Sequence, residues 1–539
     1  MRIDWPPSAL SCFSPADTLI QMDRLFAALK AMFLIAPASD AESSAMNVES
    51  PAFDRRLARL MLCAAGLLCL AFGIRMLAAW KTYHHVDPTA GVWTAAALDA
   101  RDGILYRPIE SEIGYGGSRY APLHIVLHAA LIRLGMGPVA AGYLLDLIGV
   151  LGVIAGVYAL LRQLEIATLP AATFAGFVLA AYCYSTTAAG LKGDLLPAGL
   201  NLWGLAAVAA TQRHKFSFML LAAAICFVLA TATKLTSIFG IAAAALWLIS
   251  RKDWPKAVLL GAVWLVGIAA AALATQWASD GRAYAIFKLC AAGGGGLTQL
   301  LHGPHRMAYD AIHNDRVFVC FWLLAAGLIV IGRKAKPPLR QWASLPAILF
   351  TVTTLGTAAI YGSPGTNCNH LVDLQASAVV VIASSFQSCR PWGRCAALAA
   401  TSIVLISAIL SGVKAVSIMR ENRHGTMMSA LADADRSTAT GPLLAENPIL
   451  PILQGRRPYM LDSFMFRAVW MRDPKIADRF WNDLSRRQFR AVILSGPPGD
   501  PTRSGNAGNF GPGFIELLQQ NYELIGHHGE YWVYLPKRP

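Results

Sequence analysis

The sequence predicts an all-α bundle of membrane-spanning helices, with about 11 crossings, followed by a small α/β domain. Three observations predict this fold class. The 539 residues are 55% hydrophobic and only 14% charged, whereas soluble globular proteins usually carry about 25% charged residues. The shortfall falls in long apolar runs, which must satisfy their own backbone hydrogen bonds in hydrocarbon and are therefore helices. The chain beyond residue 416 instead mixes strand-like runs with helical periodicity.

Residues 1–54 are expected to be a poorly ordered amino-terminal extension. They contain a weakly amphipathic patch, TLIQMDRLFAALKAMFLIAP, and then the polar run SDAESSAMNVES. No clean small-residue cleavage site follows the patch, so we do not interpret it as a removed signal peptide. Two alternatives stay open: a helix on the membrane surface, or upstream sequence that the fold does not need, with Met46 as the functional start.

Residues 55–415 are predicted to form the transmembrane domain, and basic loops indicate its orientation. DRRLAR precedes the first span, and QRHK, RKDWPK, RKAKPPLR and CRPWGR lie between later apolar runs. Because short cytoplasmic loops carry an excess of Lys and Arg, we expect these loops and the amino terminus in the cytoplasm. The loops then expected on the outer side are those around Lys192 and Lys234 and those at 278–315 and 361–370. Residues 416–539 follow the last span to the same side.

The segment APLHIVLHAALIRLG, residues 121–135, is short for a crossing, which needs about 20 residues. We therefore interpret it as a juxtamembrane or partly inserted helix on the outer side. In the last domain, GPLLAENPIL and FRAVILS predict strands, and PKIADRFWNDLSRRQ predicts a helix. NYELIG and EYWVYLP, separated by His-His-Gly, predict a closing hairpin, and the Gly- and Pro-rich stretch between these elements predicts a loop.

Charge and cysteine content argue against a nucleic-acid-binding protein and against a cysteine metal site. The formal net charge is +14, but much of it lies in short loops and no basic-aromatic module accompanies it, so nucleic-acid binding is not expected. The 10 cysteines lack CxxC spacing and Cys/His metal-site spacing. Most lie in apolar runs, where cysteine behaves as a small hydrophobic residue.

Asp87 is the first candidate functional residue, because ionisable groups at or just outside the membrane are costly. It follows the first span at once, in YHHVDPTAG. A partly buried carboxylate at the mouth of a bundle has the chemistry of a general base. The alternative is structural, since Asp followed by Pro is also a signal for a helix N-cap, and the two roles are compatible.

Four further outer-side segments supply polar candidates, each of which has a solvated loop, a helix cap or a snorkelling side chain as its structural alternative. The candidates are Glu110, Glu112, Tyr115, Arg119, Tyr120 and His124 in the first segment, Lys192 and Asp194 in the second, Lys234 in the third, and Arg282, Lys288 and His313 in the fourth. The fourth segment also contains the run Gly293–Gly296. These glycines either let backbone N–H groups approach a phosphate or break a partly inserted helix.

Taken in order, these residues resemble the GT-C superfamily of integral-membrane glycosyltransferases, near the branch with protein O-mannosyltransferases and the aminoarabinose transferase of lipid A. The resemblance runs from about residue 57 to the tail. Asp87 stands where family members carry an acid in the first outer loop. The elements that match the family are RDGILYRP and RYAPLH, LKGDLL for R-x-D with Lys192 in place of arginine, Lys234 to Thr236 for K-x-T, GTNCNHLVDLQAS, and AENPILPILQGRRPYMLDSFMFR. Two features depart from the family pattern. The first loop has His85-Val86-Asp87 instead of an Asp-Glu pair, and lysine at 192 cannot offer the two-pronged hydrogen bonding of arginine.

The resemblance implies a membrane glycosyltransferase that moves a sugar from a polyprenyl-phosphate donor to a glycan, lipid or protein acceptor. The reaction would take place on the periplasmic face of a bacterial inner membrane, with Asp87 as general base. The residues implied to bind the donor phosphate are Arg119, Lys192, Lys234, Arg282 and Lys288. Those implied to line the substrate pocket are Glu110, Glu112, Tyr115, Tyr120, His124, Asp194, His313, Asn369 and His370. No cofactor or metal ligand is assigned, and a divalent cation, Mg or Mn, stays an open alternative. The competing functions are a transporter or flippase of lipid-linked sugars and a non-catalytic envelope assembly protein.

Overall fold

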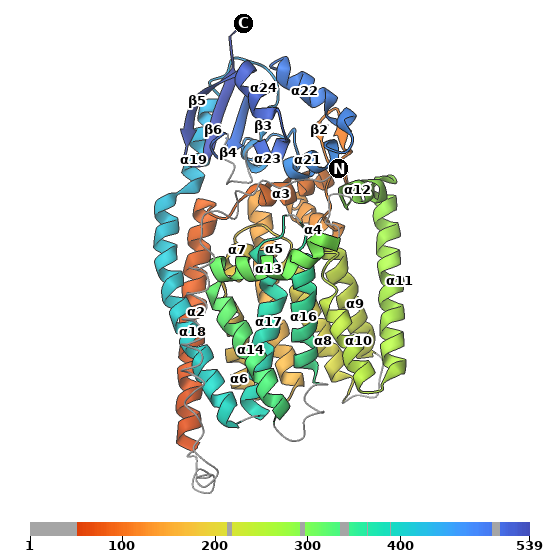
Figure 1. The fold of residues 1–539 in the computed structure, drawn as a ribbon, viewed down its shortest axis with the longest axis vertical. Helices are drawn as coiled ribbons and strands as arrows, with labels where there is room; N and C mark the ends of the chain where they lie inside the picture. Colours follow the sequence, from red (N-terminus) through yellow and green to blue (C-terminus); the bar gives the residue numbers. More distant parts are fainter. Residues whose placement is uncertain are drawn as a thin grey trace.

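The structure is a computed structural model. It describes residues 51–212, 218–291, 297–334, 344–363, 365–388, 390–498 and 507–538. Residues 1–50 of the expected extension and the glycines of 293–296 lie outside the described residues. The rest forms an elongated bundle of helices with a small mixed α/β domain at one end (Figure 1).

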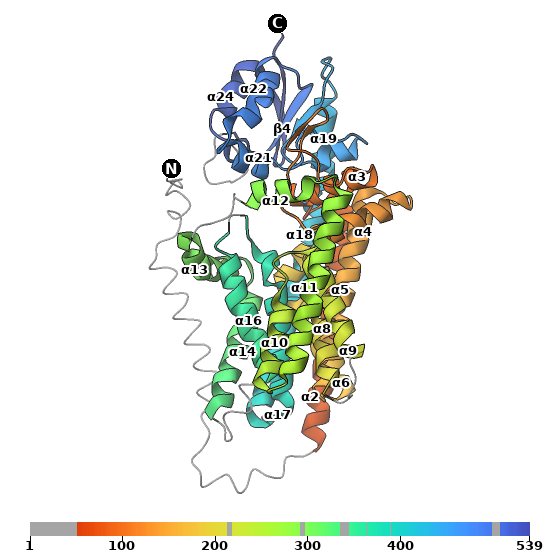
Figure 2. The same ribbon diagram turned by 90° about the vertical axis from the view of Figure 1, so that its right-hand side faces the viewer.

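The bundle helices run along the long axis of the molecule (Figures 1 and 2). They are α2 (Pro51–Thr82), α5 (Pro138–Gln163), α6 (Thr168–Phe177), α8 (Leu195–Ala210), α9 (Phe218–Thr233), α10 (Phe239–Ser250), α11 (Trp254–Ala278), α14 (Arg316–Lys334), α16 (Leu345–Ile360), α17 (Val372–Ser388) and α18 (Arg390–Glu421). Among the described residues, four helices are long and apolar enough to cross a membrane, or five if the bent pair Thr168–Ala180 and Tyr182–Ala188 is one span. Several apolar spans are therefore confirmed, and the count of about 11 stays a prediction.

Close packing of α5 on α8 fixes the start of α8, which carries a candidate residue. A Cβ added to Gly149 of α5 would lie 2.7 Å from Leu195 Cβ, and one added to Gly156 would lie 2.8 Å from Leu202 Cβ. Small residues let helix backbones approach closely where lipid supplies no hydrophobic driving force. The amino-terminal end of α8, directly after Asp194, is thereby held against α5.

Shorter helical elements join the long helices to one another and to the terminal domain. They are α3 (Pro88–Arg101), α4 (Pro122–Arg133), α7 (Tyr182–Ala188), α12 (Arg282–Ala291), α13 (Leu297–Asn314), and the 3-10 turns η3 (Val178–Ala180) and η4 (Cys368–Leu371). In both views α3, α4 and α12 lie near the boundary with the terminal domain (Figures 1 and 2). The segment 121–135 thus forms α4 at this end of the bundle.

The terminal domain contains a four-stranded sheet in the order β3-β4-β6-β5. The strands are β3 (Leu443–Ala445), β4 (Ala491–Ser495), β5 (Tyr522–His528) and β6 (Tyr531–Pro536); β3 pairs parallel with β4, and the other pairs are antiparallel. The helices are α19 (Arg423–Ala434), α20 (Ile449–Leu453), α21 (Ser463–Trp470), η5 (Pro474–Ala477), α22 (Asp478–Ser485), α23 (Ala507–Phe510) and α24 (Phe514–Asn521). The predicted α/β composition is confirmed. Two details differ: α23 lies in the stretch expected to be a loop, and His527 and His528 belong to β5, so that Gly529 and Glu530 make the turn.

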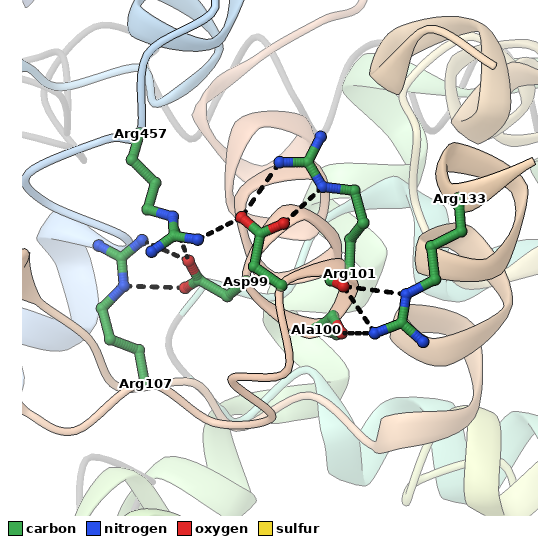
Figure 3. Close-up of polar contacts among 7 residues, drawn as sticks. Asp99, Ala100, Arg101, Arg107, Arg133 and Arg457 are labelled. Atoms are coloured by element: carbon green, nitrogen blue, oxygen red, sulfur yellow. Dashed lines mark hydrogen bonds and ion pairs between the residues drawn. The ribbon is translucent and has the colours of Figure 1, made fainter. Parts of the chain in front are cut away.

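Several contacts join the terminal domain to the segment that follows α2, and two of them involve a buried aromatic or charged side chain. The hairpin β1 (Glu110–Ser111) and β2 (Gly114–Tyr115) is held by hydrogen bonds between Tyr115 and the backbone at Tyr459 and Leu461. Farther along, Asp99 of α3 makes a buried two-pronged pair with Arg107, both N–O distances being 2.8 Å, and Arg457 of the terminal domain lies beside it (Figure 3). A salt bridge of this buried, two-pronged type fixes geometry well.

Candidate functional site

Asp87 lies in the turn between α2 and α3 and uses its two carboxylate oxygens differently. Oδ1 accepts a hydrogen bond from the N–H of Ala90 at 2.9 Å, and Pro88 occupies the first helical position, so Asp87 is the N-cap of α3. Oδ2 lies 2.9 Å from Nζ of Lys192. The N-cap role of Asp87 is therefore confirmed, its second oxygen pairs with a lysine, and its role as general base stays a prediction.

Lys192 reaches Asp87 from the loop between α7 and α8 and is almost completely buried. Burial alone would lower the pKa of Lys192, but the Asp87 carboxylate outweighs it and raises that pKa, so the ammonium stays charged. The carboxyl of Asp146 in α5 lies against the backbone N–H groups of Leu191 and Lys192. Asp146 of the bundle thus supports the loop that carries Lys192.

Asp194 pairs with a different lysine. It precedes α8, but its side chain does not cap that helix. Instead Oδ1 forms a salt bridge with Lys234, from the turn after α9, and Oδ2 accepts from Nδ2 of Asn369 at 2.7 Å. Burial acts to raise the pKa of Asp194, but Lys234 outweighs it and the pKa is lowered. One loop therefore contributes to two carboxylate–lysine pairs, through Lys192 and, two residues later, Asp194.

Aromatic and basic side chains surround these pairs. The ring of Trp93 in α3 stacks on Tyr120 with centroids 4.1 Å apart and meets His124 of α4 edge-on at 4.8 Å. Burial lowers the pKa of His124 to about 3, with His128 as a second cause, so His124 is neutral. The electrostatic environment of Tyr120 includes Asp87 and Asp194.

Arg119 and His370 come from two other segments and lie near the Asp194–Lys234 pair and Tyr120. The Arg119 guanidinium lies 5.8 Å from the centre of the Phe464 ring of the terminal domain, and its charge acts on His370 in η4. Burial, reinforced by Lys234, lowers the pKa of His370. The candidate site, defined as Asp87, Arg119, Tyr120, His124, Lys192, Asp194, Lys234, Asn369 and His370, thus draws on the starts or ends of several helices.

Six other predicted residues lie in different surroundings. Glu110 and Glu112 are exposed on the β1–β2 hairpin, whereas Tyr115 is fully buried in the core of the terminal domain, where its hydroxyl accepts from the N–H of Phe480 at 3.1 Å. Arg282 donates to the carbonyl of Tyr106 at 3.2 Å and pairs with Asp280. Lys288 is exposed on α12, and His313 at the end of α13 bonds to the carbonyl of Tyr309.

The described part of the chain contains no group of three or more His, Cys, Asp or Glu side chains that could hold a metal ion. The carboxylates of the site instead have lysine and amide partners, as described above.

Comparison with known proteins gives matches by structure alone. No family model and no curated protein matches the sequence. ArnT from Cupriavidus metallidurans, bound to undecaprenyl phosphate, matches with a TM-score of 0.56 and 14% identity over 87% of this chain and 97% of that chain. The apo form matches with a TM-score of 0.56 and 15% identity over 87% and 96%. The chain has an ArnT-like fold.

An arabinofuranosyltransferase, AftD from mycobacteria, matches with a TM-score of 0.45 and 15% identity over 88% of this chain and 40% of that chain, a similarity too weak to carry an argument. The predicted resemblance to GT-C membrane glycosyltransferases is thus confirmed at the level of the fold. With its candidate spans, the ArnT-like chain is a multi-pass membrane protein.

Three further buried residues lie near the candidate site, and none of them was predicted to belong to it. Asp146 supports the Lys192 loop, and its signal was a lone acid in the apolar run AGYLLDLIGV, since a charge inside a span is costly. Asp315 is buried and accepts from the N–H of Cys183 at 2.7 Å, which holds α7. Asn447 is buried against the residue before Asp87; it lies in AENPILPILQGRRPYMLDSFMFR, one of the stretches that resemble the GT-C family, but no role was predicted for it.

Proposed function

We propose that the chain is a glycosyltransferase that moves a sugar from a polyprenyl-phosphate donor to a hydroxyl group of a glycan, lipid or protein. The observation that carries the proposal is the pair of adjacent carboxylate–lysine contacts, Asp87–Lys192 and Asp194–Lys234, at the end of an apolar bundle. The ArnT structure with this fold was determined with undecaprenyl phosphate bound, which supports a lipid phosphate as the donor class. In this proposal the reaction takes place on the periplasmic face of a bacterial inner membrane, with residues 55–415 as the catalytic domain and 416–539 outside.

In the proposed reaction Asp87 removes the proton of the acceptor hydroxyl. The acceptor oxygen then forms a bond to the anomeric carbon as the bond from that carbon to the phosphate oxygen breaks, with inversion, and polyprenyl phosphate leaves. Lys192 and Lys234 stabilise the charge that develops on the leaving phosphate, which is the term that contributes most in such reactions. When Lys192 turns to the phosphate, the Asp87 carboxylate is free to accept the proton.

The remaining residues of the candidate site hold this arrangement. Asp194 holds Lys234 by charge and is itself held by a hydrogen bond from Asn369, and Arg119 adds a positive charge that acts on His370. Neutral His124 and the Trp93–Tyr120 stack pack against Gly193, between Lys192 and Asp194. Roles for Arg282 and Lys288 in donor binding, and for the other predicted pocket residues, stay predictions.

The first test compares the masses of glycolipids and surface glycans in cells with and without the chain. We expect one glycan or glycolipid to lose a sugar when the chain is absent. Wild type and Asp102→Asn should restore it, and Asp87→Asn should not. Asp102 is a matched control because it flanks the other end of α3 and pairs with Arg101 and Arg457. Full restoration by Asp87→Asn would refute the proposed base.

A second test separates a transferase from a flippase of lipid-linked sugars. Purified chain is mixed in detergent micelles with an undecaprenyl-phosphate sugar and the acceptor found by mass analysis. A transferase forms product there, because both substrates reach the same site without a second leaflet. Absence of product with chain that is folded and binds undecaprenyl phosphate would favour the flippase.

A further inference from the structure

Asn447 of the terminal domain binds the turn that carries Asp87. This fully buried side chain donates from Nδ2 to the carbonyl oxygen of Val86 at 3.2 Å and accepts at Oδ1 from the N–H of Ile449 at 3.1 Å. The two partners fix the orientation of the amide, since a carbonyl only accepts and an N–H only donates. The residue directly before Asp87 is thus held by a side chain 361 positions away in the sequence.

Gly91 brings the first turn of α3 against the same segment. A Cβ at this position would lie 2.7 Å from Asn447 Oδ1, 2.7 Å from Pro448 Cδ and 2.9 Å from the backbone nitrogen of Ile449. These distances are shorter than real Cβ contacts, and two of the atoms belong to a rigid ring and to backbone, so the approach requires glycine. The N–H of Gly91 also donates to the carbonyl of Asp87 at 3.1 Å, which closes the turn.

The segment that bears Asn447 is itself anchored in the sheet. The N–H of Glu446 donates to the carbonyl of Ile493 at 3.0 Å, and its carboxyl accepts from the N–H of Ser495 at 2.7 Å and from Nδ2 of Asn509 at 2.6 Å. Ile493 and Ser495 belong to β4. Hydrogen bonds between β4 and Glu446, together with the bond from the next residue, Asn447, to Val86, therefore connect β4 to the peptide unit that precedes Asp87.

We infer that Asn447 and Gly91 are positioning residues for Asp87, so that one segment of the terminal domain orients the proposed base. The inference rests on the proposed function, in which Asp87 is the general base. Asp87 caps α3 with one oxygen and meets Lys192 with the other, so the direction of its carboxylate follows the orientation of the Val86–Asp87 peptide. A misplacement of a reacting group by about 1 Å can lower a rate by about 100-fold.

Asn447→Asp is the sharpest variant. It keeps an oxygen that accepts from Ile449 but replaces the donor to Val86 with a second acceptor. We expect kcat to fall by about 10- to 100-fold while KM changes by less than about 2-fold, and Asn447→Ala and Gly91→Ala to behave in the same way. The assay uses the full chain in detergent with an undecaprenyl-phosphate sugar and the acceptor found by mass analysis.

Arg457→Gln is the matched control, because Arg457 joins the same domain to the far end of α3 through Asp102 and Asp99. It should destabilise the interface and leave kcat within about 2-fold of wild type. In amide hydrogen exchange, Asn447→Asp should speed exchange at Ala90 and Gly91, and Arg457→Gln should not. The double variant Asn447→Asp with Asp87→Asn should be no slower than Asp87→Asn alone, since the two residues act through one group.

Three results would overturn the inference. They are wild-type kcat in Asn447→Asp, an equal fall of kcat in Arg457→Gln, and unchanged exchange at Ala90 and Gly91. The failure of the proposed function looks different. In that case Asp87→Asn itself leaves transfer unchanged, whereas an inactive Asp87→Asn beside a fully active Asn447→Asp refutes only the positioning role.

Discussion

Removing Lys234 is expected to destabilise the chain more than removing its partner Asp194. The Asp194 side chain is 8% exposed and that of Lys234 is 22% exposed. In Lys234→Met the buried Asp194 carboxylate keeps its hydrogen bond from Asn369 but loses the lysine that neutralises it. Breaking a buried pair in this way costs about 3–5 kcal/mol, and the partial access of water through the Lys234 position places the expected loss near 3 kcal/mol. The ratio of folded to unfolded chain then falls by roughly 100-fold.

Asp194→Asn leaves a lysine that reaches the surface, because a long aliphatic stem lets an ammonium group turn to water. We expect a loss of about 1 kcal/mol for this variant and for the double variant Asp194→Asn with Lys234→Met, in which no charge stays buried. The measurement is equilibrium unfolding of purified chain in mixed micelles with increasing dodecyl sulfate, followed by tryptophan fluorescence. Equal losses for the two single variants, or a double variant as unstable as Lys234→Met, would refute this reasoning.

Three further predictions concern buried groups of α3 and the terminal domain. Asp99→Asn removes the two-pronged partner of buried Arg107, and thermal unfolding should show a loss of about 3–5 kcal/mol. Burial raises the pKa of Glu446 to about 8, above its unfolded value, so its contribution to stability is complete below the unfolded pKa and is lost as pH rises toward 8. The melting temperature should therefore depend less on pH, between pH 5 and 9, in Glu446→Gln than in the wild type. An equal dependence on pH in that variant would contradict the assignment. Tyr115→Phe leaves the buried N–H of Phe480 without its acceptor and should lower stability by about 1–3 kcal/mol in chemical unfolding.

The spans and the strands of the terminal domain were predictable because periodicity and apolar length are local properties. FRAVILS and EYWVYLP became β4 and β6 because apolar β-branched and aromatic residues fill a buried sheet. The hairpin turn was misplaced by two residues, since His527 pairs with Trp532 and His528 with Tyr531, and composition alone does not reveal where pairing stops. Strand order, with β6 between β4 and β5, depends on packing that no single segment encodes.

The charged residues of the candidate site were predictable, but their pairing was not. Lys192 and Asp194 stand out because charges at the ends of apolar runs are costly. Their nearness in sequence suggests a mutual pair, yet Lys192 binds Asp87 and Asp194 binds Lys234. The choice depends on how the turns after α2 and α9 meet the start of α8, which is tertiary information.

Residues of the Tyr-rich segment were harder to place. The Gly and Tyr composition around Tyr115 fits a polar pocket and equally fits a hairpin that inserts an aromatic ring into another domain. The structure places Tyr115 between Tyr459, Phe466 and Phe480 of the terminal domain. Only the sequence of that distant domain contains the reason, since it supplies the aromatic partners.

Helix α11 lies at the outer edge of the bundle, and only 11% of its apolar window is covered by protein (Figure 1). For α5 the corresponding share is 50%. Acyl chains, more than neighbouring side chains, would therefore solvate α11, and the thickness and fluidity of the bilayer would govern its tilt. Extraction into micelles should thus disturb α11 more than α5, and a preparation that keeps annular phospholipid should preserve its position better.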